Sequence, residues 1–413
     1  MIKKAFWVSL LVFVCLVSSL WFFAPSAEAF TKEQKLFLQS WRIVNRSYVD
    51  ESFNGENWWF IREDFIKKSM RDRQETYDVI EEMLALLDDP FTRLLRPKAY
   101  SSLQVSTSGE LFGVGLQISL DPQTKLVEVI TPIVGSPAES AGIHPLDYIL
   151  EIDGVATDTL TLDAAAERMR GPAGTTVFLT VQNHDRDEDS IQTLAIVRDR
   201  ITLNPVYANL DERNEEAIGY IRLSEFSANA TQEIAHAIMD LTMQGAQSYI
   251  LDLRNNPGGL LQAGIGTARL WLDHGTIVYT VNRKGTLGSF EAYNYSLTDD
   301  PLVVLVNKGT ASASEILAGA LHDNDRAILV GETTYGKGLI QSLFELPDDS
   351  GIAVTVAKYE TPNHTDINKL GIEPDYVVPQ EPITFAQVGT KVDLQYQKAI
   401  ELLTSEKLVA EAI

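Results

Sequence analysis

Cysteine is almost absent from the 413 residues of the chain, because the only one is Cys15. It lies in an apolar stretch, residues 5–24, that follows two lysines and precedes Ala27-Glu28-Ala29. A basic start, an apolar run and a small-x-small pattern are together typical of an export signal. We therefore expect residues 1–29 to be a signal peptide that is cleaved after Ala29. The remaining chain has no thiol, which excludes disulfides, a cysteine nucleophile and thiolate metal ligands.

The same apolar stretch allows a second interpretation. Its length is close to the roughly 20 residues that span a bilayer. If it were not cleaved, it would anchor the protein to a membrane.

Positively charged residues are also scarce. The chain has 34 Lys and Arg against 57 Asp and Glu, a formal net charge of −23. This balance argues against nucleic-acid binding, which needs a basic surface, and mainly favours solubility. There is no low-complexity segment and no repeat with a period of 20–50 residues, which excludes a solenoid or propeller. The length predicts two or three domains.

Three common catalytic signatures are missing: the Gly-x-Ser-x-Gly elbow, the His-Glu-x-x-His zinc site and the Gly-x-Gly-x-x-Gly dinucleotide loop. The six histidines form no cluster with ligand spacing, so we expect no metal and no cofactor. No local signature supports a Ser-His-Asp triad. Residues 331–338 nearly form a P-loop, but Gly338 stands where Ser or Thr must hold magnesium, which disfavours nucleotide binding.

Hydrophobic periodicity divides the rest of the chain into four regions. Residues 30–103 carry apolar residues at spacings of three and four, which predicts a helical N-terminal region. Residues 104–198 consist of short apolar runs punctuated by glycine, which indicate strands. Residues 199–385 contain near-continuous apolar runs, such as residues 302–306, that are typical of strands buried on both faces of an α/β sheet. Residues 386–413 end in an amphipathic helix that we expect to pack back on the body.

The succession of elements in residues 104–198 resembles a PDZ domain. Its glycine-bearing loop would be Leu111-Phe112-Gly113-Val114, whose N–H groups would bind a chain-terminal carboxylate. The strand after this loop would pair with an extended peptide by strand addition. A plain β-turn explains the short motif equally well, but the whole succession through Gly154 and Gly171 favours the PDZ interpretation.

Three motifs in residues 199–385 could carry chemistry. Asn255-Asn256-Pro257-Gly258-Gly259 follows a buried strand, where it forms either an ordinary turn or an oxyanion hole of backbone N–H groups. Ser312 begins a helix with Glu315 three residues later. This spacing is a capping box, but a helix start also suits a nucleophile, because the positive helix end stabilises an oxyanion. Gly336-Lys337-Gly338 then places a lysine between two glycines, and Gln341 follows.

In this order the three motifs resemble the carboxyl-terminal processing peptidases, which are serine endopeptidases with a Ser-Lys dyad. The resemblance covers nearly the whole chain. It implies that Ser312 is the nucleophile, that Lys337 is the general base and that Gln341 orients the lysine. It also implies an oxyanion hole made by the N–H groups of Gly258 and Ala313. The implied fold is α+β and multidomain, with a helical N-terminal region, a PDZ domain and a crotonase-like α/β catalytic core.

The neighbouring residues supply weaker candidates. Ser314 is the rival nucleophile, although the family register favours Ser312. Asp323 aligns with an acidic position that matters in some relatives, and a structural carboxylate at a helix end is the alternative. His322 is a poor base, because ten residues along a helix place it about 15 Å from Ser312. Lys337 is the better base only if burial away from carboxylates lowers its pKa from about 10.4 to roughly 7–8.

Within the family the resemblance is strongest to the cyanobacterial and chloroplast branch, to judge from residues 356–362 and 369–375. That branch trims the C-terminal extension of a photosystem II reaction-centre subunit in the thylakoid lumen. We therefore expect an exported enzyme of the thylakoid lumen or periplasm, acting on proteins with free C-terminal tails. Membrane contact would come only from an uncleaved N-terminal segment or from a membrane-embedded substrate. A general periplasmic tail-specific protease and a secreted, non-cleaving PDZ peptide-binding module remain as alternatives.

Overall fold

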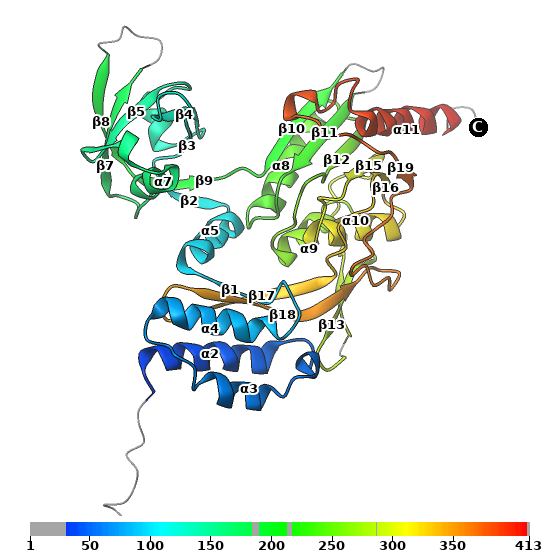
Figure 1. Ribbon diagram of the computed structural model, residues 1–413. Coiled ribbons are helices and arrows are strands. Elements are labelled where there is room, and N and C mark those ends of the chain that lie inside the picture. Colours follow the sequence, from blue (N-terminus) through cyan, green and yellow to red (C-terminus); the bar gives the residue numbers. More distant parts are fainter. Residues whose placement is uncertain (1–29, 184–189, 213–216, 286, 411–413) are drawn as a thin grey trace, which may run out of the picture. The chain divides into compact units, whose positions relative to one another are not determined.

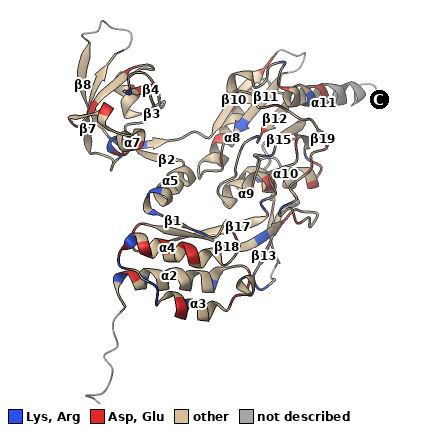
Figure 2. Cartoon of the chain, in the orientation of Figure 1, with Lys and Arg blue, Asp and Glu red and all other residues tan. Residues whose placement is uncertain are grey.

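The computed structural model describes residues 30–183, 190–212, 217–285 and 287–410 (Figure 1). The expected signal peptide lies outside these residues. The chain forms two compact units, one made of the residues up to 46 with residues 52–94, the other of residues 47–51 with those from 95 onward. In the described part of the chain, no helix is long and apolar enough to cross a membrane. Lys and Arg are dispersed over the elements among Asp and Glu (Figure 2).

The first unit is built from helices, as the periodicity predicts. These are α2 (Lys32–Ser47), the single turn η1 (Phe53–Gly55), α3 (Trp58–Phe65) and α4 (Arg73–Ala85). The Asp72 side chain caps α4 by accepting a hydrogen bond from the Glu75 N–H. Phe37, Ile80 and Met83 are fully buried, so the apolar faces of α2 and α4 form the core of this unit.

The segment predicted to be a PDZ domain contains five main strands and two short α-helices. The strands pair in the order β3 (Leu116–Leu120), β4 (Val127–Pro132), β5 (Tyr148–Ile152), β7 (Thr176–Gln182) and β8 (Ile191–Val197), and β6 (Val155–Ala156) pairs with β5. The helical elements are α6 (Pro137–Ser140), η2 (Thr157–Thr159) and α7 (Leu162–Met169). The domain has its own core, which includes Val127, Ile149 and Leu179. In this sheet β3 is an edge strand, so one of its sides is unpaired within the sheet.

Two segments lead into and out of this sheet. Helix α5 (Pro97–Ser108) precedes it, so the boundary predicted after residue 103 falls inside a helix. Strand β2 (Glu110–Gly113) then pairs antiparallel with β9 (Asp199–Thr202).

The predicted α/β region contains a mostly parallel sheet with helices on both faces. Its strand order is β10 (Val206–Asp211), β11 (Ile218–Leu223), β12 (Ser248–Asp252), β15 (Leu302–Val306), β16 (Ile328–Gly331) and β19 (Tyr376–Val377). Only the β10–β11 pair of this order is antiparallel. Side chains alternate between the faces. Ile221, Leu251 and Val304 pack with α8 (Ala230–Met243), α9 (Leu261–Arg269) and α10 (Ala313–Asp323).

The opposite face of this sheet is covered by the C-terminal helix α11 (Leu394–Ala410). Tyr220, Ile250 and Val303 pack there against Tyr396 and Ala399. Burial on both faces explains why these strands are continuously apolar in the sequence. In this structure the last helix therefore lies against the sheet.

The α/β region also contains a second, antiparallel sheet. Strand β18 (Gly351–Glu360) pairs with β17 (Leu339–Glu345) and with β13 (Thr276–Asn282), which pairs in turn with β14 (Leu287–Glu291). The remaining elements are β1 (Arg93–Leu95) and the turn η3 (Phe385–Gln387).

Candidate active site

Ser312 lies at the sharp turn from β15 into α10. It caps the N-terminus of the helix and has φ 59° and ψ −117°, a left-handed backbone conformation that is costly for a residue with a Cβ. Such strain is concentrated at functional sites, where the fold must hold a side chain in an otherwise unfavourable position. The turn places Ser312 at the positive end of the helix, as a nucleophile that generates an oxyanion requires.

The glycine turn after β12 packs directly against Ser312. At Gly258, whose φ is 98°, a Cβ atom would lie 2.7 Å from the Ala311 carbonyl oxygen and 2.8 Å from the Ser312 Cβ. It would also lie 2.9 Å from the Ala313 nitrogen. The fold therefore brings together the two residues predicted to form the oxyanion hole, and only glycine fits at position 258.

The Gly258 N–H already has a partner inside the turn. It donates to the side-chain oxygen of Asn256 at 2.9 Å. Asn256 is fully buried, and its own side-chain N–H₂ donates to the Leu223 carbonyl. An oxyanion at this turn would share or displace the Asn256 oxygen.

Hydrogen bonds join the glycine turn to the loop that carries Ser312. The Asn255 N–H donates to the Asn307 side-chain oxygen at 2.9 Å, and the Asn307 side chain donates back to the Asn255 side chain at 3.0 Å. The Asn256 carbonyl accepts from the Ala311 N–H and from the Ser314 hydroxyl, both at 3.0 Å. Ser314, the rival nucleophile, is fully buried, and its hydroxyl makes this structural hydrogen bond. Ser312 is therefore the better candidate.

The carboxylate of Glu315 connects the serine loop to the lysine loop. This side chain is fully buried and accepts from the Ser312 N–H at 2.8 Å, so it caps the helix as the spacing predicts. It also accepts from the Gly336 N–H at 2.7 Å and the Lys337 N–H at 2.9 Å. The Ser312 and Lys337 N–H groups donate to the same oxygen, Oε2, so the backbones of the predicted nucleophile and base are held side by side.

Two further residues complete this buried cluster and were missed in the sequence. The Thr334 hydroxyl donates to Glu315 Oε1 at 2.5 Å. The Tyr359 hydroxyl donates to the Ser312 carbonyl at 3.2 Å, and burial, followed by the charge of Glu315 and a hydrogen bond to it, raises the pKa of Tyr359 well above its ordinary value. Both residues lie more than 20 positions from Ser312 in sequence and carry no motif of their own.

The two glycines around Lys337 pack against residues 368–371. At Gly336, with φ 85°, a Cβ would lie 2.9–3.0 Å from backbone atoms of residues 369–371. At Gly338 a Cβ would lie 2.9 Å from the Asn368 nitrogen. Gln341 lies in β17, where its side-chain N–H₂ is 3.4 Å from the Thr355 hydroxyl. Its predicted role of orienting the lysine stays a prediction.

The predicted carboxylate loop of the PDZ domain is mostly a strand. Leu111, Phe112 and Gly113 lie in β2, where they pair with residues of β9. Val114 follows this strand, is buried, and accepts a hydrogen bond from the Ala138 N–H. Carboxylate binding at these four residues remains a prediction, and in this structure the connection between β2 and the edge strand β3 is only two residues long.

His322 and Asp323 lie at the opposite end of α10 from Ser312. His322 Nδ1 is 2.9 Å from Asp323 Oδ1, and His322 Nε2 is 3.3 Å from Asp375 Oδ1. Burial by itself lowers the pKa of His322, but the hydrogen bonds and charges of the two aspartates outweigh it and raise the pKa. Asp323 also accepts from the Asn363 N–H at 3.0 Å, a contact typical of a structural carboxylate at a helix end.

No group of three or more His, Cys, Asp or Glu side chains among the described residues is arranged to hold a metal ion.

Comparison with known proteins identifies two regions. Residues 217–378 match the model of peptidase family S41, and residues 128–183 match a PDZ domain. The first match contains all the predicted catalytic and oxyanion residues. The second lies within the segment predicted to be a PDZ domain.

Full-length relatives extend the likeness to nearly the whole chain. A carboxyl-terminal-processing protease of Picosynechococcus sp. is 62% identical over 93% of this chain and 92% of its own length. Carboxyl-terminal-processing peptidase 2 of the Arabidopsis thaliana chloroplast is 46% identical over 86% of this chain and 71% of its own. A solved structure described as a photosystem II D1 C-terminal processing protease is 41% identical, with a TM-score of 0.56, over 88% of this chain and 99% of that one.

Proposed function

Because the chain belongs to the carboxyl-terminal-processing proteases of peptidase family S41, we propose that Ser312 and Lys337 form its catalytic dyad. The chain is a serine peptidase, and C-terminal processing is the activity of its close relatives. The observation that carries the dyad is the shared bond to Glu315 Oε2, because one buried oxygen holds the Ser312 and Lys337 backbones together.

In the proposed reaction the neutral Lys337 amine accepts the Ser312 hydroxyl proton while the serine oxygen attacks the scissile carbonyl. The N–H groups of Gly258 and Ala313 stabilise the negative oxygen that forms. The lysine then gives its proton to the leaving amine, the scissile C–N bond breaks, and the C-terminal peptide departs, leaving the shortened protein as an acyl-enzyme on Ser312. A water molecule, deprotonated by Lys337, releases the shortened protein and restores the serine.

Glu315 imposes a requirement on this mechanism. A buried carboxylate near Lys337 favours the charged ammonium, whereas a general base must be neutral. From the lysine loop, the Gly336 and Lys337 N–H groups and the Thr334 hydroxyl donate to Glu315, which disperses its charge over neutral donors. In the proposed site, Glu315 therefore positions Lys337 through its backbone N–H.

We further propose that the substrate is the D1 precursor of photosystem II, processed in the thylakoid lumen after export of the enzyme. The support is the 62% identity to a cyanobacterial relative and the likeness to the solved D1 processing protease. The PDZ domain would present the free C-terminus by adding the tail to the unpaired side of β3. Membrane contact would then be made through the membrane-embedded substrate.

The substrate proposal is tested by incubating residues 30–413 with three proteins and locating the cuts by mass spectrometry. The first carries the D1 C-terminal extension, the second carries the same extension with an amidated end, and the third carries an unrelated apolar tail. We expect rapid trimming of the first and slow trimming of the second, because amidation removes the carboxylate. Equal trimming of the first and third would instead indicate a general tail-specific protease.

A further inference from the structure

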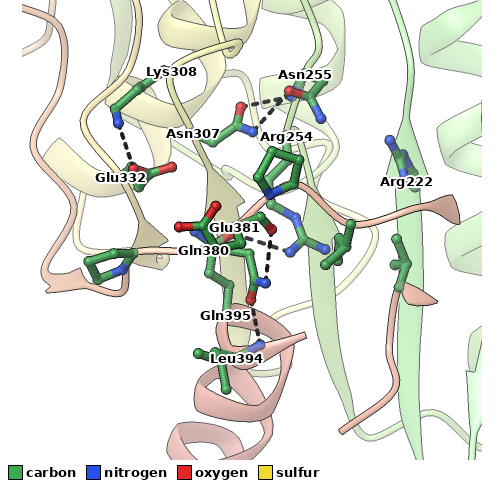
Figure 3. A pocket seen from close by; sticks show the side chains of 14 residues that line it. Arg222, Arg254, Asn255, Asn307, Lys308, Glu332, Gln380, Glu381, Leu394 and Gln395 are labelled. Atoms are coloured by element: carbon green, nitrogen blue, oxygen red, sulfur yellow. Dashed lines mark hydrogen bonds and ion pairs between the residues drawn. The ribbon is translucent and has the colours of Figure 1, made fainter. Parts of the chain in front are cut away.

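Each loop of the proposed catalytic site has its own support. Asn255 and Asn307 exchange hydrogen bonds that join the glycine turn to the serine loop, as the dashed lines between them in Figure 3 show. The lysine loop, residues 334–338, is instead held by residues 368–372, which lie between β18 and β19. The position of Lys337 therefore depends on what fixes residues 368–372.

Three hydrogen bonds join residues 368–372 to the lysine loop. The Lys369 N–H donates to the Gly336 carbonyl at 2.8 Å. The Thr334 N–H donates to the Ile372 carbonyl at 3.1 Å, and the Ile372 N–H donates in return to the Thr334 hydroxyl at 2.8 Å. Ile372 is also buried in the same core as α10. A shift of residues 368–372 would therefore displace the backbone that leads into the catalytic lysine.

Residues 363–375, here named the lysine support, contact one histidine of α10 through an aspartate at each end. At the first end, the Asn363 N–H donates to Asp323 Oδ2 at 3.0 Å, and Asp323 Oδ1 lies 2.9 Å from His322 Nδ1. At the second end, Asp375 Oδ1 lies 3.3 Å from His322 Nε2. One imidazole ring therefore connects both ends of the lysine support to the helix that the proposed nucleophile caps.

This geometry requires a protonated ring. Both nitrogens of His322 face a carboxylate oxygen, and an ionised carboxylate can only accept hydrogen bonds. Neutral imidazole carries one N–H, so only the imidazolium can donate to both aspartates. Loss of the proton would turn a lone pair of the ring toward one carboxylate, and that end of the lysine support would be released.

The surroundings of the ring favour its charged form. The charged groups that act most strongly on His322 are Asp323, from α10 itself, and Asp375, from the segment before β19. In the turn after β18, His364 and Glu360 pair with each other at 3.0 Å. Burial lowers the pKa of His322, but the hydrogen bonds and charges of the two aspartates outweigh it and raise the pKa. The ring therefore stays protonated to a higher pH than an ordinary histidine.

We propose that His322, as the imidazolium, is a positioning residue for the catalytic lysine. By joining Asp323 to Asp375 it fixes both ends of the lysine support, which holds the backbone that leads into Lys337. The inference rests on the proposed function, because it takes Lys337 to be the general base. Two titrations then act on turnover in opposite directions as the pH rises, since Lys337 becomes neutral and active while His322 loses its proton and releases the support.

The test separates these titrations by comparing enzymes that share the same lysine. His322→Gln removes the cation that joins the two aspartates. His236→Gln is the matched control, because His236 is an exposed histidine on α8. We would measure kcat and KM on a tailed protein from about pH 6 to about pH 9, with the melting temperature at each pH to confirm folding. The ratio of kcat values at one pH cancels the titration of Lys337.

We expect His322→Gln to lower kcat about fivefold or more near pH 6 while it changes KM less than about twofold. This loss should shrink toward about pH 9, where the wild type has also lost the imidazolium. His236→Gln should match the wild type throughout. An equal loss of kcat at every pH, or no loss in a folded His322→Gln, would overturn the proposal.

A second measurement does not depend on activity. Amide hydrogen exchange of residues 363–375, followed by mass spectrometry, should be faster in His322→Gln than in the wild type near pH 6. The same exchange rate in both proteins would show that His322 does not hold the lysine support. A wild type that trims no tailed protein would contradict the proposed function, and the exchange measurement would still decide whether the support depends on His322.

Discussion

At the scale of single residues, Glu315 has a larger role than its place in a capping box suggests. A helix cap satisfies N–H groups of its own helix, whereas this carboxylate also accepts from Thr334, Gly336 and Lys337. Those donors lie about 20 residues further along the chain, and no local sequence pattern predicts that they contact Glu315. The sequence could therefore predict the cap but not the link to the lysine loop.

Glu315→Gln tests this link. The amide offers one acceptor and one unwanted donor where several N–H and O–H groups point inward, and a lost hydrogen bond to a charged group costs roughly 1.5–3 kcal/mol. If the lost hydrogen bond raises the activation free energy by this amount, kcat should drop about 10- to 100-fold. Glu401→Gln is the control, because Glu401 is an exposed partner of Lys398 on α11. Unchanged kcat in Glu315→Gln would show that the link does not position the dyad.

Gly258 offers a second test at this scale, with a matched glycine elsewhere. Gly258 and Gly245 have φ of 98° and 99°, but a Cβ at Gly245 has no atom within 4 Å, whereas one at Gly258 would meet the Ser312 loop. Substitution by alanine brings a similar backbone strain at both, about 1 kcal/mol or more. We expect Gly245→Ala to keep its activity and Gly258→Ala to lose most of it in steady-state assays. Equal activities would remove Gly258 from the oxyanion hole.

At the scale of elements, a buried ionic cluster of Arg254, Asp252 and Asp393 joins the start of α11 to the end of β12. Arg254 binds Asp252 through two nitrogens, at 2.9 and 2.6 Å, and Asp393 through two, at 2.7 and 2.9 Å. Asp393 also accepts from the Tyr396 N–H in the first turn of α11. Burial disfavours the charged form of Asp252, but Arg254 outweighs it, and the pKa of Asp252 is lowered.

Removing the arginine from this cluster should be costly. Arg254→Met leaves two buried carboxylates without their partner, which typically costs about 3–5 kcal/mol. Lys398→Met removes a half-buried ion-pair partner of the exposed Glu401 and a cation–π contact with Tyr376, and should cost about 1 kcal/mol or less. Urea unfolding followed by circular dichroism measures both. Similar stabilities of the two variants would mean that the cluster does not hold α11 in place.

The far end of α10 should respond to pH. Because the aspartates raise the folded-state pKa of His322 above the ordinary 6.5, protonated His322 stabilises the fold. This contribution is full below the unfolded-state pKa and is lost as the pH rises through the higher folded-state pKa. The difference in melting temperature between wild type and His322→Gln should be largest near pH 5.5 and should shrink above pH 7. His144→Gln is the control, because His144 is exposed. If the difference in melting temperature between wild type and His322→Gln did not change with pH, the stabilising role of protonated His322 would be wrong.

At the scale of the whole molecule, the sequence predicts most of the architecture and part of the site. Apolar runs such as those of β12 and β15 identify the buried sheet. The order of the motifs predicts that Gly258, Ser312 and Lys337 belong to one site. Sequence patterns fail to predict the structure where two segments that are far apart in the chain form a strand pair. Leu111 to Gly113 were predicted to form a loop, but β9, nearly 90 residues later, takes them into a strand. The contacts of Tyr359, Thr334 and Asp393 likewise depend on tertiary packing.

The central claim is that Ser312, activated by Lys337, is the nucleophile. The most direct measurement compares the trimming of a tailed protein by wild type, Ser312→Ala, Lys337→Ala and Ser314→Ala, with the product mass identifying the cut. We expect no trimming by Ser312→Ala or Lys337→Ala, and trimming by a folded Ser314→Ala, whose hydroxyl only supports the glycine turn. Trimming by Ser312→Ala at the wild-type rate, together with an inert but folded Ser314→Ala, would contradict the account.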